Sequence, residues 1–254
     1  MNIKYTESDK LRCYSFETRA EMGVYAARDI ADEIKRQLCE KDEINMIFAA
    51  APSQNDVLSS LITHGEIEWG RINAFHMDEY IGLEADAPQG FGNFLKNAIF
   101  DRVPFKTVNL IDSTADDPEK ECARYSDLLN SHKCDIIVMG IGENGHIAFN
   151  DPHVADFNDK KTVKVVSLDE VCRQQQVNDG CFESIDSVPK YALTLTVPTL
   201  VAPEAVFCIV PAKTKAQAVK NTVYGAIGEK CPATALRLHG NAKLYLDAES
   251  SALI

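Results

Sequence analysis

Short apolar segments alternate with amphipathic ones along most of this chain of 254 residues, and this alternation limits the possible folds more than any other feature. The clearest apolar segment, CDIIVMGI (134–141), is apolar at nearly every position, as a strand covered on both faces should be. YAARDIADEIKRQLCEK (25–41) instead has its apolar residues at helical spacing. Strands that alternate with helices predict an α/β fold, in which helices flank a mainly parallel sheet on both faces as a Rossmann-like three-layer sandwich.

The same patterns place the remaining elements. They predict strands at 44–50, 72–77, 108–112, 162–168, 192–200, 205–211 and 243–247, and helices at 55–64, 88–103, 117–132, from 169 and from 214. No repeat or low-complexity linker interrupts them, so we expect a single domain over residues 1–254. Ligands of open α/β sheets lie beyond the carboxyl ends of the strands, so the residues that follow strands are the candidates for a site. These are APSQND (51–56), HMDEY (76–80), GENGHIAFND (142–151) and PAKTK (211–215).

Composition narrows the classes of protein to which the chain can belong. Its net charge of -12 argues against binding to nucleic acid or to an anionic membrane, which needs a basic face. An anionic small molecule stays possible, because a local cluster of donors is enough to bind it. The first residues lack an apolar signal-peptide region, and no run approaches the roughly 20 apolar residues that span a bilayer, so we expect a cytoplasmic protein. The eight cysteines are scattered, and we expect them to stay reduced.

The stretch GIGENGHIAFNDP (140–152) begins with G-x-G-x-x-G, the pattern of a dinucleotide-binding turn. That turn requires the third glycine to open a helix, whose N-terminus receives the pyrophosphate. The residues that follow, HIAFNDPHVADFNDKK, contain a proline, two asparagines and three aspartates, so no amphipathic helix fits before the strand at 162. We therefore interpret the stretch as a flexible loop in which glycines at 140, 142 and 145 let backbone N–H groups approach a ligand, with Gly145 as a candidate contact.

This loop carries three candidate catalytic residues, Asn144, His146 and Asp151. A histidine can exchange protons with a substrate near neutral pH, and Asp151 could orient the imidazole or tune its charge. A tight loop whose Asn and Asp side chains bond only their own backbone explains the residues equally well. A metal set of His146, Asp151 and His153 matches no common zinc spacing, so we expect no metal.

Two adjacent acids, Asp78 and Glu79, follow the strand at 72–77. Their side chains point in different directions, so at most one of them can face a cleft. A carboxylate that is partly desolvated there would have a raised pKa and would suit general-base catalysis. If HMDEY (76–80) is considered alone, however, two solvated acids at a turn are the favoured explanation.

Two further strand ends hold residues suited to an anion. Lys213 and Lys215 stand where a helix begins, and a bound phosphate would relieve the conflict between their charges and the helix dipole. Ser53 precedes another helix start, where its hydroxyl can cap the helix or donate to a phosphate. Solvated surface lysines are an equal alternative.

Taken together, four segments resemble the glucosamine-6-phosphate deaminase (isomerase) family. They are FHMDEYIGL (75–83), GIGENGHIAFNDP (140–152), VPKYALTLTVPTL (188–200) and AKTKAQAV (212–219), in the order and spacing of that family and over nearly the whole chain. The related 6-phosphogluconolactonases share the fold but typically lack both the A-F-N-[DE]-P continuation and M-D-E-Y. The fold expected is therefore of the deaminase/phosphogluconolactonase type.

The resemblance implies an enzyme without metal or cofactor. Such an enzyme isomerises glucosamine 6-phosphate from aldose to ketose and releases ammonia and fructose 6-phosphate. By position, Asp78 corresponds to the base that moves a proton between C2 and C1. His146 corresponds to the acid–base group that opens the sugar ring, and Asp151 to the acid that belongs with this histidine in a relay. The family includes monomers and hexamers, so a homo-oligomer is possible.

The phosphate-binding residues follow the resemblance less closely. Lys215 matches the family's phosphate-binding lysine. The family's Gly-Gly-Thr phosphate loop stands here as Ala51-Pro52-Ser53-Gln54, so Ser53 and Gln54 are candidate phosphate ligands. The family's phosphate-binding arginine has no clear match, and Arg173, displaced by several residues, is the nearest candidate.

Two departures lie beside the histidine and leave other functions open. Asn144 stands where the family usually has Asp, and an amide cannot stabilise an imidazolium by charge or accept a proton from it. Asp151 is one methylene shorter than the usual Glu. A 6-phosphogluconolactonase-type hydrolase and a sugar-phosphate-binding protein without catalysis therefore stand as alternatives to a divergent deaminase.

Overall fold

The main sheet of the computed structural model, which describes residues 3–254, has eight strands in the order β1-β2-β11-β10-β7-β3-β4-β6. Every pairing in it is parallel except that of β1 with β2. The prediction of a mainly parallel sheet is therefore confirmed. The strands are β1 Lys4–Ser8, β2 Leu11–Ser15, β3 Ile44–Phe48, β4 Ile72–His76, β6 Thr107–Asn109, β7 Ile136–Met139, β10 Ala205–Val210 and β11 Ala242–Leu246.

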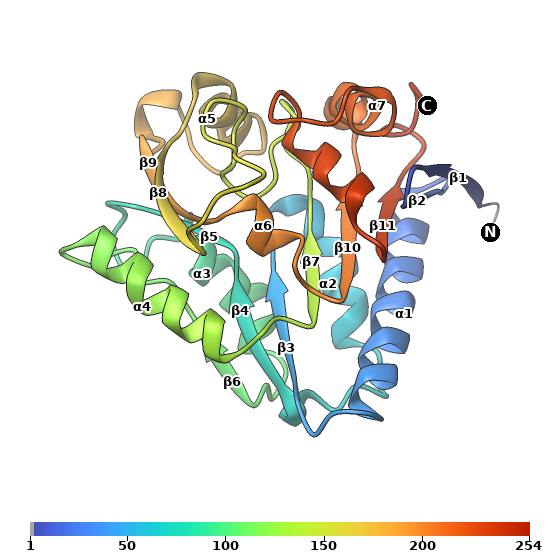
Figure 1. Cartoon of the computed structure of the whole chain (residues 1–254), viewed down its shortest axis with the longest axis horizontal. Coiled ribbons are helices and arrows are strands. Elements are labelled where there is room, and N and C mark those ends of the chain that lie inside the picture. The colour runs from blue at the N-terminus through green and yellow to red at the C-terminus, as the bar shows by residue number, and fades with distance from the viewer. Residues whose placement is uncertain (1–2) are drawn as a thin grey trace.

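Helices cover both faces of this sheet (Figure 1). Alternate side chains of its central strands point to opposite faces, and since these side chains are apolar, both faces must be covered. In β7, Ile136 and Val138 pack in one apolar cluster with residues of α1 and α2, whereas Ile137 and Met139 pack in a second cluster with residues of α4 and α7. The three predicted layers are thus present. The longer helices are α1 Arg19–Leu38, α2 Asn55–Ile62, α4 Pro118–Ser131, α5 Glu170–Asn178 and α7 Ala216–Tyr224.

A second, antiparallel sheet was not predicted from the sequence. It contains β5 (Asp78–Tyr80), β9 (Tyr191–Leu195) and β8 (Val163–Ser167), and it lies with α5 at the end of the main sheet to which β3 and β7 point (Figure 1). The chain passes from the main sheet to this one at Met77, so HMDEY is divided between two sheets. This division sets Asp78 beyond the carboxyl end of β4.

Three boundaries differ from the prediction. The expected strand at 192–200 ends at Leu195, because Pro198 lacks a backbone N–H and falls in the first turn of a short helix, α6 (Val197–Leu200). The expected helix at 88–103 is α3 (Phe91–Leu95) followed by a π-helical turn at Lys96–Phe100. The hairpin of β1 and β2 was missed, because β1 is an exposed edge strand without an apolar pattern. Within residues 3–254, no helix combines the length and the apolar character needed to cross a bilayer.

Candidate active site

One pocket gathers the residues that follow four parallel strands. It is lined by the segments after β3, β4, β7 and β10, together with one face of α5. Two of its wall residues, Ala148 and Ala212, have positive φ angles of 46° and 83°, a conformation that strains a residue with a Cβ. Five residues expected from the sequence line the pocket: Ser53, Gln54, Asp78, His146 and Lys215.

The two acids of HMDEY face different surroundings, as their alternation predicted. Asp78 lines the pocket, and its carboxylate has no hydrogen-bond partner among the described residues. Burial, and then the charge of Glu79, raise the pKa of Asp78 well above the ordinary aspartate value. Glu79 instead accepts hydrogen bonds from the backbone N–H groups of Tyr80, Phe91 and Gly92, at 2.8–3.0 Å. Both acids are buried, so the alternative of two solvated acids is wrong.

The loop after β7 carries His146 and is fixed to β9 by two hydrogen bonds. The side-chain amide of Asn150 donates to the carbonyl of Leu195 at 2.8 Å, and the backbone N–H of Phe149 donates to the hydroxyl of Thr194 at 3.0 Å. Because Thr194 pairs with Asp78 in the second sheet, the same strand positions both candidate catalytic residues.

The glycines of the G-x-G-x-x-G pattern serve packing around this loop. A Cβ at Gly142 would lie 2.2 Å from two ring atoms of His146, so the imidazole fills the space of the missing side chain. A Cβ at Gly140 would approach Gln54 at 3.1 Å, and one at Gly145, which has a φ of +87°, would lie 2.6 Å from the Sγ of Cys231. Gly145 does not line the pocket and is a structural residue, contrary to its prediction as a ligand contact.

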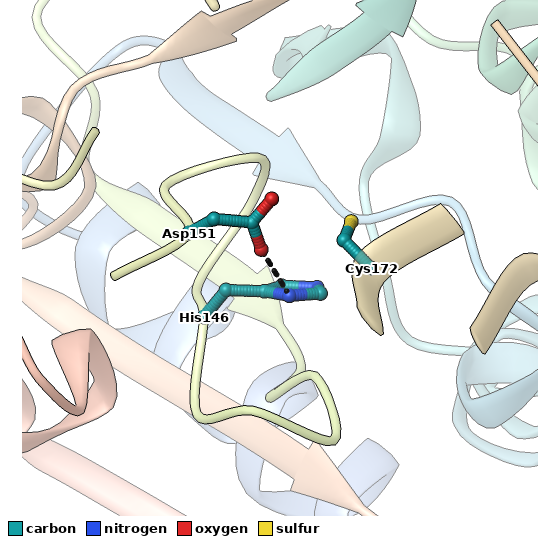
Figure 2. A group of neighbouring side chains, drawn as sticks. All are labelled: His146, Asp151 and Cys172. Carbon is teal, nitrogen blue, oxygen red and sulfur yellow. Dashed lines mark ion pairs between the residues drawn. The ribbon is translucent and has the colours of Figure 1, made fainter. Parts of the chain in front are cut away.

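His146 and Asp151 are neighbours inside the loop. Oδ1 of Asp151 lies 3.0 Å from Nδ1 of His146, and Figure 2 shows it approaching the ring from outside the ring plane. The contact is therefore an ion pair when the imidazole is protonated, without an in-line hydrogen bond. Burial would raise the pKa of Asp151, but the contact with His146 and a hydrogen bond from Asn144 hold it below the ordinary value. Asp151 thus remains ionised beside the imidazole.

Asn144 acts through Asp151 and does not touch the imidazole ring. Its Nδ2 donates to Oδ1 of Asp151 at 3.0 Å and to Oδ2 of Asp169 at 3.3 Å, and its Oδ1 accepts the backbone N–H of His146 at 3.0 Å. Asn144 therefore orients the imidazole only indirectly, through Asp151 and through the backbone of His146. The amide also separates two carboxylates that would otherwise repel each other.

Cys172 completes the group of side chains in Figure 2. Its sulfur and the nearest atoms of His146 and Asp151 all lie within 4.8 Å of one another, a set that could hold a metal ion. Burial, and then the charge of Asp151, raise the pKa of the Cys172 thiol well above its ordinary value, whereas a metal ligand must be a thiolate. His153, from the metal set considered in the sequence, lies outside this group and stands instead with Asp151 and Asp169.

Lys215 is buried in the pocket wall, and it has no anionic partner within residues 3–254. The residue is 5% exposed, and no hydrogen bond or ion pair reaches its ammonium group from the described residues. Burial lowers its pKa, although the charges of Asp179 and Glu143 oppose this shift. It stands in a 3₁₀ turn, Lys213–Lys215, directly before α7, so it faces the pocket near a helix N-terminus. Lys213 is exposed and does not line the pocket.

Ser53 and Gln54 lie in the 3₁₀ turn that precedes α2. The hydroxyl of Ser53 does not cap the helix, and instead accepts a hydrogen bond from Nε2 of Gln54 at 3.0 Å. The same Nε2 group contacts the carbonyl of Ile209 at 3.2 Å, which ties this turn to β10. The Oε1 atom of Gln54 is buried and has no partner among residues 3–254.

The structure does not bring Arg173, the predicted phosphate ligand, to the pocket. Arg173 does not line the pocket, because its guanidinium donates to the backbone carbonyls of Ile185 and Val188. Four polar residues of the pocket lie outside the candidate segments of the sequence: Arg19, Gln175, Gln176 and Asp179. Helical spacing could have grouped the last three on one face of α5, whereas Arg19 lies in a polar helix start that carries no motif.

Comparison with known proteins decides the family. Residues 17–245 match the family described as glucosamine-6-phosphate isomerases/6-phosphogluconolactonase. The chain belongs to this family. Among curated proteins it is similar to glucosamine-6-phosphate deaminase 1 of Bacillus subtilis, with 34% identity over 249 residues, or 96% of this chain and 98% of the relative. It is also similar to the glucosamine-6-phosphate deaminase of Listeria welshimeri, with 32% identity over 84% of this chain and 88% of the relative.

Solved structures of the glucosamine-6-phosphate isomerase/6-phosphogluconolactonase family confirm the fold. A monomeric glucosamine-6-phosphate deaminase aligns with a TM-score of 0.87 and 33% identity over 95% of this chain and 99% of its own. A 6-phosphogluconolactonase from Thermotoga maritima aligns with a TM-score of 0.77 but only 20% identity, over 94% of this chain and 100% of its own. The second likeness concerns the fold alone.

Proposed function

We propose that this chain converts glucosamine 6-phosphate and water into fructose 6-phosphate and ammonia. The observation that carries the proposal is the meeting of three groups in one pocket. They are a buried carboxylate, a histidine paired with an ionised aspartate, and a buried lysine with which no carboxylate of the described residues pairs. The names of the curated relatives and of the solved structure with 33% identity support the same activity.

The phosphate group of the substrate would bind at Lys215. A buried ammonium without a partner is costly, and a phosphate supplies the missing negative charge. The hydroxyl of Ser53 stands before α2, where the free backbone N–H groups of a helix start favour an anion. Lys215 and Ser53 would hold the phosphate end of the sugar. Its C1 and C2 atoms would then face Asp78 and His146.

His146 would open the sugar ring. Neutral imidazole can take the proton of the C1 hydroxyl and return it to the ring oxygen as the C1–O5 bond breaks. The imidazolium that forms in between is stabilised by the ionised Asp151, which lies 3.0 Å from Nδ1. Asn144 keeps Asp151 in place by its hydrogen bond and so serves as a positioning residue.

Asp78 would carry out the isomerisation. Its carboxylate removes the proton from C2 of the open-chain sugar and delivers it to C1, while O1 gains a proton and the amino nitrogen loses one, so that the aldose becomes the 2-imine of fructose 6-phosphate. Desolvation makes this carboxylate a stronger base than an aspartate in water, as the task requires. Water then adds at C2, the C2–N bond breaks, and ammonia leaves with fructose 6-phosphate as the second product.

The test is incubation with glucosamine 6-phosphate and assay of both ammonia and fructose 6-phosphate. We expect equal amounts of the two products and no formation above background by the Asp78→Asn variant. Hydrolysis of 6-phosphogluconolactone, measured alongside, separates the lactonase alternative. The proposal is wrong if the wild-type protein forms no more ammonia than the variant does.

We propose that one chain suffices for activity, because the solved structure with 33% identity is described as that of a monomeric glucosamine-6-phosphate deaminase. Light scattering at the enzyme concentration used in the assay would test this, and activity confined to a larger assembly would contradict it.

A further inference from the structure

Arg19 is a cation of the pocket wall that no motif indicated. It is the first residue of α1 and lines the pocket beside the turn that contains Ser53. Among the lining residues, Arg19 and Lys215 are the only arginine and lysine, whereas the wall also contains the acids Asp78 and Asp179. An anionic group that enters the pocket is therefore attracted to the part of the wall that carries Arg19 and Lys215.

The guanidinium of Arg19 is held in place by two neighbours. Its Nε contacts Oδ2 of Asp56 at 2.5 Å, and its Nη2 donates to the carbonyl of Pro52 at 2.5 Å. Its Nη1 has no partner among residues 3–254. A guanidinium that is already ordered loses little further conformational entropy when it binds a ligand, and its remaining N–H groups stay available.

Close packing of α1 against α2 creates this arrangement. A Cβ on Gly23 of α1 would lie 2.7 Å from the Cβ of Asp56, so only glycine lets the two helices come this near. Asp56 stands in the first turn of α2 and thereby reaches Arg19 at the start of α1. The side chain of Arg19 thus joins the start of α1 to the turn 52–54.

We propose that Arg19 contacts the phosphate of the substrate and serves as the second cation of its binding site, from α1. This inference rests on the proposed function, since it assigns a residue to the phosphate end of that substrate. Arg173 is not placed for the role, because it does not line the pocket. Arg19 sets the affinity for the phosphorylated substrate, while the proton transfers take place at Asp78 and His146.

The test compares Arg19→Gln with Arg28→Gln, an exposed arginine of the same helix that lies outside the pocket. Loss of a charge-assisted contact to phosphate raises KM for glucosamine 6-phosphate by about 10-fold or more and leaves kcat within about threefold. We expect Arg19→Gln also to lose most of the thermal stabilisation by inorganic phosphate. Arg28→Gln should match the wild type in all three measurements.

A second variant separates contact with the phosphate from a purely structural role. Asp56→Asn weakens the anchor of Arg19 but keeps the guanidinium, so it should raise KM by no more than about threefold. If Asp56→Asn is as damaging as Arg19→Gln, the arginine acts by holding the turn, and the inference is overturned. Arg19→Lys, which keeps the charge without the fork of donors, should lie between wild type and Arg19→Gln.

The same measurements distinguish this inference from the proposed function. If the wild type forms ammonia and Arg19→Gln has an unchanged KM and an unchanged response to phosphate, the inference fails and the function stands. If the wild type forms no ammonia but is stabilised by fructose 6-phosphate, and Arg19→Gln loses that stabilisation, the function fails and the inference holds.

Discussion

The imidazole of His146 occupies the space that a side chain at Gly142 would need. A Cβ at position 142 would lie 2.2 Å from both Cε1 and Nε2 of the ring and 2.4 Å from Nδ1. The middle glycine of G-x-G-x-x-G is thus explained by a histidine four residues later, within one loop. The sequence pattern is typical of nucleotide binding, but in the structure its middle glycine leaves space for the imidazole of His146.

Gly142→Ala should displace His146 and remove most of the activity. The methyl group cannot coexist with the ring in its present place, so the imidazole must turn away from the pocket and from Asp151. Since general acid–base groups contribute roughly 10²–10⁴-fold, we expect kcat to fall at least about 100-fold, with little change in KM. Steady-state assays of ammonia release would measure this.

Gly65→Ala is the matched control for that variant. Nothing lies within 4 Å of a Cβ at position 65, and its φ is not in the left-handed region, so alanine should be neutral there. Circular dichroism should show both proteins folded. Full activity of Gly142→Ala would mean that the observed place of the ring is not the catalytic one.

Asp78→Asn should inactivate the enzyme and stabilise it. Burial and the charge of Glu79 raise the pKa of Asp78 in the folded state, so folding becomes less favourable as pH rises through that range and the carboxyl ionises. Asparagine removes this cost, and the free energy of unfolding at neutral pH should increase. In the wild type, kcat should fall on acidification with an apparent pKa clearly above the ordinary value of about 4. Denaturant titration would measure the gain in the free energy of unfolding, and a pH–rate profile would measure the fall of kcat on acidification.

Glu79→Gln should have the opposite effect on stability. Burial raises the pKa of Glu79 too, but we expect the loss of backbone hydrogen bonds to outweigh the removal of its charge. The carboxylate of Glu79 accepts three backbone N–H bonds, and an amide offers only one oxygen and presents an NH₂ group to the remaining donors. Unsatisfied buried donors cost about 1–3 kcal/mol each, so the free energy of unfolding should decrease by a similar amount. Equal stability changes in the two variants would contradict the different surroundings assigned to these acids.

Lys215→Met should weaken substrate binding without weakening the fold. Burial lowers the pKa of Lys215, so its charge costs stability in the folded state at pH values below that lowered pKa, and methionine removes the cost. We expect an unchanged or higher Tm without ligand, and a KM for glucosamine 6-phosphate raised at least about 10-fold. Lys213→Met, at an exposed lysine two residues earlier, should change neither quantity. A large loss of Tm in Lys215→Met would show that the lysine is structural.

The sequence predicted those parts of the site that depend on local pattern. Apolar runs such as 134–141 indicated buried strands, and the polar residues that follow strands made Asp78, His146 and Lys215 candidates beside the alternatives of solvated or purely structural residues. The rule that ligands lie at the carboxyl ends of parallel strands then brought segments far apart in the chain together. The choice of these residues over the alternatives needed the resemblance of four segments to the family as well.

The remaining features depend on contacts between distant segments. The second sheet pairs β5 with β9, more than a hundred residues later, and nothing in the short segment DEY indicates that partner. Arg19 reaches the pocket only because Gly23 lets α1 approach Asp56. The carbonyls that hold Arg173 belong to a loop without a regular pattern. Local propensity contains no information on such contacts.

Asn144→Asp, which introduces the residue that the resemblance leads one to expect, should harm this enzyme. The amide of Asn144 donates to Asp151 at 3.0 Å and to Asp169 at 3.3 Å, so an aspartate would place a third carboxylate between two others. We expect the free energy of unfolding near pH 8 to fall by about 1–3 kcal/mol and kcat to decrease. Both losses should shrink on mild acidification, because one of the three carboxyls then binds a proton.

The double variant Asn144→Asp/Asp169→Asn tests this explanation. Asparagine at 169 can still cap α5, where Asp169 now accepts the backbone N–H of Cys172 at 2.6 Å, and it offers a new donor to the introduced carboxylate. A double-mutant cycle on the free energy of unfolding should therefore show a favourable interaction between the two substitutions, and activity should recover in part. If Asn144→Asp alone is as stable and as active as the wild type, then Asn144 is not an adaptation to the neighbouring Asp151 and Asp169.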